Sequence, residues 1–237
     1  MSTWTAKRFW KETTVTAQDD GFGVALDGRA VKTPAKAPFA VPSRALAQAI
    51  AAEWEAQEGE IRPETMPLTR AANAAIDKVA SQHAEVAAYI AEYGGTDLLC
   101  YRATTPAVLA ERQAQGWDPL LAWAKDRFGV VLNVTQGLLP VAQPEADLQV
   151  LRAHVAALTP FQLSALHDLV GITGSLILGL AVIEGHLQAE SAFTLSRIDE
   201  SFQAEEWGQD EEAHLADMVK KQALLDAERF WLLLHGK

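Results

Sequence analysis

The sequence is poor in cysteine. Its only thiol, Cys100, lies in the apolar stretch LLCY of a 237-residue chain. A single cysteine excludes an intramolecular disulfide and a zinc site built from several thiolates. This usage fits a reducing compartment, such as a bacterial cytoplasm or a mitochondrial matrix.

Long apolar runs are also absent. The longest uncharged apolar stretch, LVGITGSLILGLAVI, covers residues 169–183 and is shorter than the roughly 20 residues that a bilayer span needs. We therefore predict a buried core helix there and no membrane insertion. The opening sequence MSTWTAKRFWKE lacks an apolar run and includes Glu12, so we expect neither a secretory signal nor a cleaved transit peptide.

Basic residues are scarce relative to acidic ones. The chain has 20 Lys and Arg against 31 Asp and Glu, which gives a net charge of −11. Nucleic acids and anionic membrane surfaces are therefore not the expected partners, because both carry the same sign of charge. A partner with a basic patch is compatible with this charge but is not implied by it.

The common catalytic signatures are missing as well. The sequence contains no Gly-x-Ser-x-Gly elbow, no phosphate loop that ends in Gly-Lys-Ser/Thr, and no His-Glu-x-x-His. The adjacent His167 and Asp168 resemble part of a catalytic relay, but no serine or cysteine nucleophile stands out beside them. A position of Asp168 near the start of a helix explains the pair more simply.

The sequence pattern indicates an α+β fold. In FGVALDGRAVKTP, the Asp27-Gly28 pair between short apolar runs predicts a two-residue hairpin, and residues 13–16 predict a strand before it. From Ser43, a good N-cap, the pattern is mainly helical. The expected helices cover residues 43–59, 68–81, 83–93, 106–128 with a break at 116–119, 145–157, 161–183, 189–205 and 209–234.

These elements predict a small β-rich N-terminal domain, residues 1–41, followed by a larger and mainly α-helical domain, residues 42–237. The β-branched stretch at residues 129–141 predicts a strand or a short hairpin. The strand near 130–141 could join the first sheet, so the N-terminal domain need not be one continuous segment of the chain.

The most unusual stretch is EEWGQDEEAH, residues 205–214. Eight carboxylates and no lysine or arginine lie between Asp199 and Asp217. Helices usually mix charge signs, because like charges one turn apart destabilise them. Three readings stay open: an acidic exposed face without a function, an acidic docking face with Trp207 as an aromatic anchor, and a cluster whose Trp207 fills the bend at Gly208 in the core.

A metal site is a weaker reading of the same stretch. Glu211 and His214 form a Glu-x-x-His step, which places two ligands on one helix face. A carboxylate-bridged di-metal bundle needs a second such step, and no other histidine has a glutamate three residues before it. We therefore predict no metal, although a metal- or carboxylate-dependent hydrolase using residues 205–214 is kept as the alternative function.

The chain resembles the assembly chaperones that handle the alpha subunit of the catalytic head of the F-type ATP synthase, the Atp-twelve family. No single matching stretch is a chemical motif, but together they cover nearly the whole chain in order. The matching stretches are RFWKE (8–12), LDGRAVKTPAK (26–36), VPSRALAQAIAAEWEAQ (41–57), MPLTRAANAAIDKV (66–79), YGGTDLLCYRA (93–103), WDPLLAW (117–123), HDLVGITGSLILGLAV (167–182) and DESFQAEEWGQDEEAH (199–214).

The resemblance implies a molecular chaperone and not an enzyme. It implies that the protein binds the free alpha subunit and prevents its aggregation before alpha pairs with beta. It implies no cofactor and no small-molecule substrate. Eukaryotic relatives act in the mitochondrial matrix, and the absence of a presequence here leads us to expect a bacterial member in the cytoplasm. A subunit that stays in the mature synthase is a third possibility, which stoichiometric co-purification with the complex would reveal.

The resemblance also assigns a partner-binding site. The family pattern Trp-Gly-x-x-Glu fits residues 207–211 and gives its functionally important glutamate to Glu211, with Glu212 adjacent and His214 three residues later. We expect this acidic segment to meet basic groups on the alpha subunit. The predicted partner-binding residues are Glu205, Glu206, Trp207, Asp210, Glu211, Glu212 and His214.

Overall fold

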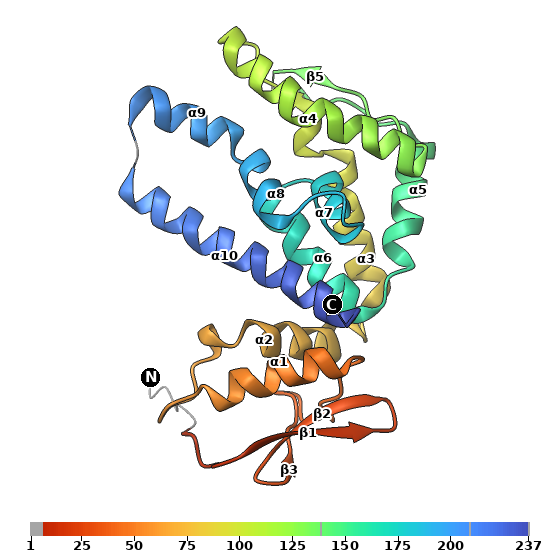
Figure 1. The fold of residues 1–237 in the computed structure, drawn as a ribbon. Helices are drawn as coiled ribbons and strands as arrows, with labels where there is room; N and C mark the ends of the chain where they lie inside the picture. Colours follow the sequence, from red (N-terminus) through yellow and green to blue (C-terminus); the bar gives the residue numbers. More distant parts are fainter. Residues whose placement is uncertain (1–6, 138, 209, 237) are drawn as a thin grey trace. The chain divides into compact units, whose positions relative to one another are not determined.

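The computed structural model describes residues 7–137, 139–208 and 210–236. The chain divides into two compact units. Unit 1 consists of Met1–Gln82, Pro160–Ala165 and Arg229–Lys237, and unit 2 consists of His83–Thr159 and Leu166–Glu228. The predicted fold class is confirmed: a small N-terminal sheet is followed by mostly helical structure (Figure 1).

The sheet of unit 1 is antiparallel, with strand order β1-β2-β3. Its strands are β1 (Thr13–Gln18), β2 (Gly21–Leu26) and β3 (Arg29–Ala30). The predicted two-residue hairpin is confirmed, because Leu26 pairs with Arg29 and the turn residues Asp27 and Gly28 have φ values of 48° and 77°. Positive φ at both positions is what a hairpin turn of this length requires.

The helices of unit 1 are α1 (Arg44–Glu55) and α2 (Pro67–Ala74), and α2 continues into a π-helix at Ala75–Val79. Ser43 caps α1 as predicted, since its side chain accepts a hydrogen bond from Leu46 N at 3.0 Å. Helix α1 packs on β1 and β2 (Figure 1). The core between them includes Val24, Val41, Leu46 and Ile50, together with Phe230 from the last segment of the chain.

Unit 2 is a helical assembly. Its helices are α3 (His83–Glu92), α4 (Ala107–Phe128), α5 (Glu145–Ala156), α7 (Leu176–Ile183), α8 (Ala189–Ser196) and α9 (Ile198–Trp207). Helices α6 (Pro160–Thr173) and α10 (Glu211–Leu234) contribute residues to both units. All eight residues of α7 are buried, so much of the long apolar stretch does form core. No helix in the described ranges is both long enough and apolar enough to cross a bilayer.

The segment 130–141 does not extend the first sheet in the described part of the chain. Its strand β5 (Thr135–Gln136) pairs in parallel with β4 (Tyr101–Arg102), and both belong to unit 2. The contacts within unit 1 also extend beyond the 1–41 segment, because α1 and α2 complete the core beside the sheet. The change in composition near residue 41 indicates where the strands end. It does not indicate where the compact unit ends, because the helices that follow share its core.

Three predicted helix limits are wrong. The break expected at residues 116–119 is absent: α4 is continuous, with Trp117 and Leu120 buried and Pro119 on the exposed side, where water can satisfy the carbonyl that loses its donor. The helix expected over 161–183 is divided at Gly174, whose φ is 69°. The helix expected over 189–205 is divided at Arg197 into α8 and α9.

Candidate partner-binding surface

Helix α9 is fixed to α4 through its inner side. Phe202 is buried, and the Arg112 guanidinium lies 5.3 Å from the centre of its ring. At the start of α9, the Asp199 carboxylate accepts a hydrogen bond of 2.6 Å from Gln113 Nε2. These contacts hold the outer side of α9, which includes Glu206 and Trp207, toward solvent.

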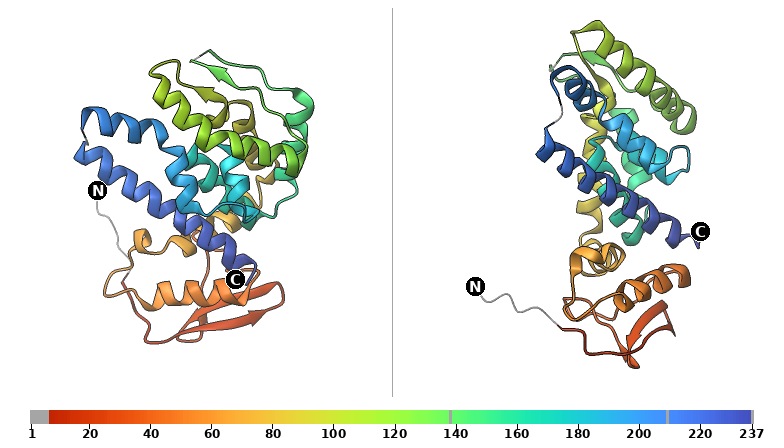
Figure 2. Two further views of the ribbon diagram at one scale, coloured as in Figure 1. Left: turned by 45° about the horizontal axis from the view of Figure 1, so that its top comes forward. Right: turned by 60° about the vertical axis from the view of Figure 1, so that its left-hand side comes forward.

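Backbone and side-chain geometry define the end of α9 and the start of α10. Gly208 ends α9 with φ 93° and ψ 157°, a conformation that a side chain would strain. Asp210 then caps α10, because its Oδ1 accepts from Glu212 N at 2.8 Å and from Ala213 N at 3.4 Å. The end of α9 and the start of α10 lie at the outer edge of unit 2 in all three ribbon views (Figures 1 and 2).

The seven predicted partner-binding residues lie at the end of α9 and in and just before the first turn of α10, and all of them are exposed. The Trp207 side chain is 80% exposed, so the reading in which it fills a core position is wrong. Glu211 is also exposed and is the first residue of α10. The exposed residues are Glu205, Glu206, Trp207, Asp210, Glu211, Glu212 and His214.

Part of the acidic charge has a local structural role. Asp199 and Glu200 lie in the first turn of α9, and Glu211 and Glu212 lie in the first turn of α10. Carboxylates at these positions are favoured by the partial positive charge of a helix N-terminus, typically by about 0.3–1 kcal/mol each. Glu206 has no such support, because it lies at the C-terminal end of α9, where negative charge is unfavourable.

Other elements neutralise some of the carboxylates, which the sequence did not reveal. Arg112 of α4 forms a 2.6 Å ion pair with Glu205. Arg197 lies 2.9 Å from Glu200 and 3.7 Å from Asp217. Four carboxylates near the end of α9 and the start of α10 form no ion pair with any described lysine or arginine. They are those of Glu206, Asp210, Glu211 and Glu212.

The sequence reasoning missed three apolar residues beside these carboxylates. Leu215, Met218 and Val219 are 57%, 57% and 71% exposed, and their spacing places them on one side of α10. The spacing to Leu224 could have revealed them. Leu224 is buried and follows Leu215 by nine residues, which places it about 180° away around a helix at about 100° per residue. The apolar side of α10 therefore changes face between Val219 and Leu224.

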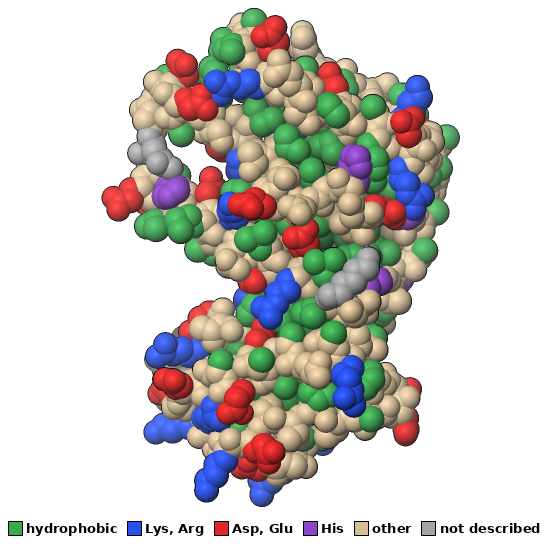
Figure 3. Space-filling model, viewed as in Figure 1, with side chains coloured by type: hydrophobic (Ala, Val, Ile, Leu, Met, Phe, Trp, Pro, Cys, Tyr) green, Lys and Arg blue, Asp and Glu red, His purple; other side chains and the backbone are tan. Residues whose placement is uncertain are grey.

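We call the combined feature the acidic–apolar surface. In Figure 3, hydrophobic and acidic side chains adjoin one another at the left edge, near the start of α10. Exposed apolar groups in contact with charged ones are typical of surfaces that bind other proteins. Its members are Glu205, Glu206, Trp207, Asp210, Glu211, Glu212, His214, Leu215, Met218 and Val219.

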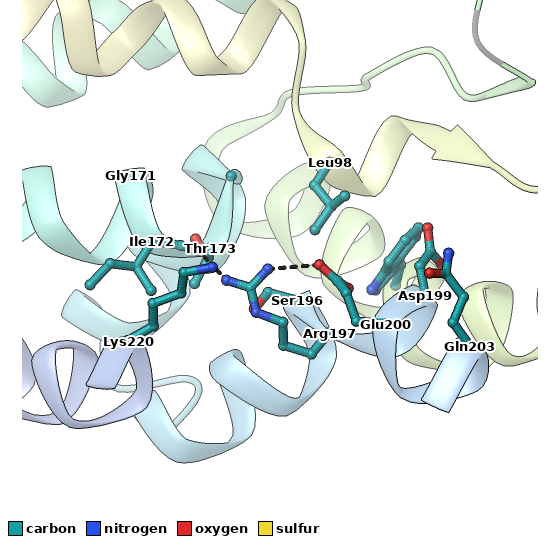
Figure 4. Close-up of a pocket in the computed structure, with 12 residues that line it drawn as sticks. Leu98, Gly171, Ile172, Thr173, Ser196, Arg197, Asp199, Glu200, Gln203 and Lys220 are labelled. Carbon is teal, nitrogen blue, oxygen red and sulfur yellow. Dashed lines mark hydrogen bonds and ion pairs between the residues drawn. The ribbon is translucent and has the colours of Figure 1, made fainter. Parts of the chain in front are cut away.

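A cavity of about 620 Å³ lies within unit 2, and its lining includes residues of α6, α9 and α10 (Figure 4). Arg197 is central to its lining: it donates to Ile172 O at 3.1 Å and pairs with Glu200. Lys220 is paired with Asp217 at 3.8 Å. Because Arg197 contacts Ile172 of α6, Glu200 of α9 and Asp217 of α10, we interpret it as a connection between these three helices.

The groups that resemble catalytic ones are poorly placed for chemistry. No group of three or more His, Cys, Asp or Glu residues in the described ranges can hold a metal ion. His167 and Asp168 are 3.0 Å apart on the surface, where Asp168 raises the pKa of His167. Asp168 lies well inside α6 and not at its start, so the helix-start explanation is wrong. Burial raises the pKa of Cys100 to about 12, which makes its thiol a poor nucleophile.

Comparison with known proteins places these features in a family. A family model described as ATP12 chaperone protein matches residues 7–125. Protein atp12, mitochondrial, from Schizosaccharomyces pombe is 28% identical over 223 residues, which cover 89% of this chain and 77% of that protein.

Solved structures match over almost the whole length. The crystal structure of Atp12 from Paracoccus denitrificans is 52% identical with a TM-score of 0.94, and the match covers 97% of this chain and 98% of that one. A mutant of the P. denitrificans protein matches equally well. The Atu1473 protein from Agrobacterium tumefaciens is 39% identical with a TM-score of 0.88, over 94% of this chain and 85% of its own.

Proposed function

The chain belongs to the ATP12 family of chaperones for ATP synthase assembly, and we propose that it binds the free alpha subunit of that synthase through the acidic–apolar surface. An unassembled subunit exposes apolar surface that it will later bury against a neighbour, and such surface is prone to aggregation. A chaperone that covers this surface prevents the aggregation. Its likeness to proteins of two bacteria supports action in a bacterial cytoplasm.

The observation that carries the proposal is the exposure of Trp207 beside carboxylates that form no ion pair with any described lysine or arginine. Tryptophan is enriched among the residues that dominate binding energy, and burying its ring removes a large apolar area from water. The carboxylates of Glu206, Glu211 and Glu212 complement a basic rim on the partner. The expected binding face on alpha is therefore an apolar patch bordered by lysine or arginine.

Glu211 is the residue with the most specific assignment, and its role is testable with a matched control. Glu211→Lys reverses one charge at the surface. Glu85→Lys makes the same change at another exposed residue in the first turn of a helix of unit 2, which is α3 and not α9 or α10. Both variants lose a similar, small helix-terminus contribution, about 0.3–1 kcal/mol. Only the first lies on the proposed binding surface.

We expect purified alpha subunit to be captured by the wild type and by Glu85→Lys, but at least about tenfold more weakly by Glu211→Lys, the effect of losing about 1.4 kcal/mol. The measurement is a pull-down at low ionic strength over a series of alpha concentrations. Equal capture by the two lysine variants would exclude a binding role for Glu211. Thermal unfolding of each variant checks that the fold is retained.

A further inference from the structure

Unit 1 contains a groove that the acidic–apolar surface of unit 2 does not explain. The groove lies along α2 and has a volume of about 390 Å³. Sites for small ligands typically occupy about 300–1,000 Å³, so it can accommodate a large side chain with its backbone. Its apolar lining is supplied by Trp54, Ile61, Pro63, Met66 and Ala74.

One wall of the groove has unusual backbone geometry. The π-helix at Ala75–Val79 places Asp77 and Lys78 in the lining. Single π-helical turns are rare and occur frequently at functional sites. Asp77 is held in place by one oxygen only, because Oδ2 accepts from Ala35 N at 3.0 Å. The fold thus fixes the position of Asp77, while its second carboxylate oxygen, Oδ1, accepts no hydrogen bond in the described part of the chain.

Three polar atoms of the lining residues are buried without a hydrogen-bond partner in the described part of the chain. They are Trp54 Nε1, which is a donor, and Asn73 Oδ1 and Asp77 Oδ1, which are acceptors. Each such atom costs about 1–3 kcal/mol in the folded protein, so native structures keep few of them. Since all three are covered in the free protein, a ligand reaches them only by parting the groove walls slightly.

The mixture of donor and acceptor selects the kind of ligand. A polypeptide backbone presents carbonyl groups, which can accept from Trp54 Nε1, and N–H groups, which can donate to Asn73 and Asp77. A purely apolar molecule satisfies neither requirement. The apolar lining then receives a side chain of the bound segment, as in other grooves that bind extended peptides.

The rim of the groove selects the charge of the ligand. Arg70 and Lys78 line it and are exposed, and no described carboxylate forms an ion pair with either. We propose that this groove binds an extended polypeptide segment in which an apolar side chain is flanked by carboxylates. The acidic–apolar surface favours basic partners, so the two sites have opposite charge preferences and can be tested separately.

The first test uses a synthetic hexapeptide with blocked ends, Gly-Glu-Leu-Phe-Asp-Gly, titrated calorimetrically into the full chain. Ala74→Trp fills the groove from the end of α2, and we expect it to weaken binding at least tenfold. Ala80→Trp is the matched control, because Ala80 is exposed, follows the π-helix and does not line the groove. Binding that Ala74→Trp leaves unchanged, or no binding by the wild type, would overturn the proposal.

The second test addresses the charge preference. The double variant Arg70→Glu/Lys78→Glu is expected to bind the acidic peptide at least tenfold more weakly, and to bind the analogue Gly-Lys-Leu-Phe-Lys-Gly more tightly than the wild type does. Arg29→Glu, in β3 of the same unit and outside the groove, should change neither affinity. Equal binding of both peptides by the wild type contradicts the proposal.

A third arm identifies occupation of the groove by the chain itself. Lys7 forms a β-bridge with Glu60, next to the groove residue Ile61. A variant without residues 2–6 should bind the acidic peptide with unchanged affinity. If peptide binding appears only after this deletion, the chain's own N-terminal segment is the occupant and the proposal fails. Capture of the alpha subunit is not measured in these experiments, so their failure leaves the proposed function unaffected.

Discussion

At the scale of single residues, Trp207 separates a binding role from a structural one. A tryptophan that is 80% exposed adds little to the folded state, because most of its ring already contacts water. Its neighbour Glu206 carries a charge that the C-terminal end of α9 disfavours and that no described cation neutralises. Neither residue is explained by the stability of the helix pair, which is why both belong to the binding surface that we propose.

We therefore expect Trp207→Ala to affect binding and not stability. The free energy of unfolding should change by no more than about 0.5 kcal/mol, as is usual for exposed positions. The affinity for the alpha subunit should fall at least about tenfold, as for a truncated anchor residue. Urea unfolding and pull-down titration provide the two measurements. Tyr89→Ala, at an aromatic residue of α3 that is 51% exposed, is the control that should keep full affinity.

The residues of the surface could be predicted only in part. Residues 205–214 stood out because charge of one sign and a tryptophan are visible in the sequence. Leu215, Met218 and Val219 were missed because apolar residues at this spacing ordinarily indicate core, and only their position relative to Leu224 shows that they face elsewhere. The pairing of Glu205 with Arg112 spans 93 residues, a separation at which sequence pattern carries no information.

At the scale of elements, the division of the long apolar stretch depends on a distant side chain. Asp97 is completely buried and accepts hydrogen bonds from Leu99 N at 3.0 Å and from Ile177 N at 2.9 Å. Ser175 caps the same helix by accepting from Leu178 N. The free N–H groups at the start of α7 are thereby satisfied inside the core, which permits an interruption that local preference would not predict.

Burial raises the pKa of the Asp97 carboxyl to about 6. In the unfolded chain the pKa of an aspartate is about 3.9. Between these values the folded protein binds a proton that the unfolded chain has released. The stability contributed by this proton is fully present below about pH 4 and is lost as the pH rises through about 6.

As the pH rises from about 4 to above 6, the free energy of unfolding of the wild type should fall by on the order of 3 kcal/mol because of Asp97. The variant Asp97→Asn should not show this fall. At pH 4 the variant should be the less stable protein, because an amide can accept only one of the two hydrogen bonds and leaves an N–H unsatisfied. By pH 7 the difference in free energy of unfolding between the wild type and the variant should be smaller. Urea unfolding of both proteins between pH 4 and pH 7 measures this difference, with the exposed Asp126→Asn as control. A difference that stays constant with pH would contradict the assignment.

At the scale of the whole molecule, charge should govern how quickly the partner is captured. The chain has a net charge of −11, and the acidic–apolar surface adds local carboxylates to this overall field. Attraction between opposite charges raises association rates and is screened by salt, with a Debye length of about 10 Å at 0.1 M.

We expect the association rate with the alpha subunit to fall steeply between about 0.05 M and about 0.5 M salt. Trp207→Ala should keep this salt dependence, whereas the double variant Glu211→Lys/Glu212→Lys should flatten it. Stopped-flow measurement of association at several salt concentrations distinguishes the two. A salt dependence that is identical in both variants would indicate that the contact carboxylates do not guide association.

The organisation of the molecule was also only partly predictable. The hairpin at Asp27-Gly28 and the cap at Ser43 depend on neighbouring residues, and both were predicted correctly. The membership of residues 160–165 and 229–237 in unit 1 depends on contacts across most of the sequence. The core position of Phe230, which is 1% exposed, has no local signal that distinguishes it from the core of a separate helical domain.

This placement of Phe230 has a consequence for how the protein is made. A ribosome delivers the strands of unit 1 about 200 residues before the segment that begins at Arg229, yet Phe230 packs in the same core as those strands. The β-rich unit therefore cannot complete its core during most of translation, although domains near an N-terminus usually fold first. A member of a chaperone family thus has an incomplete core of its own until α10 has been synthesised.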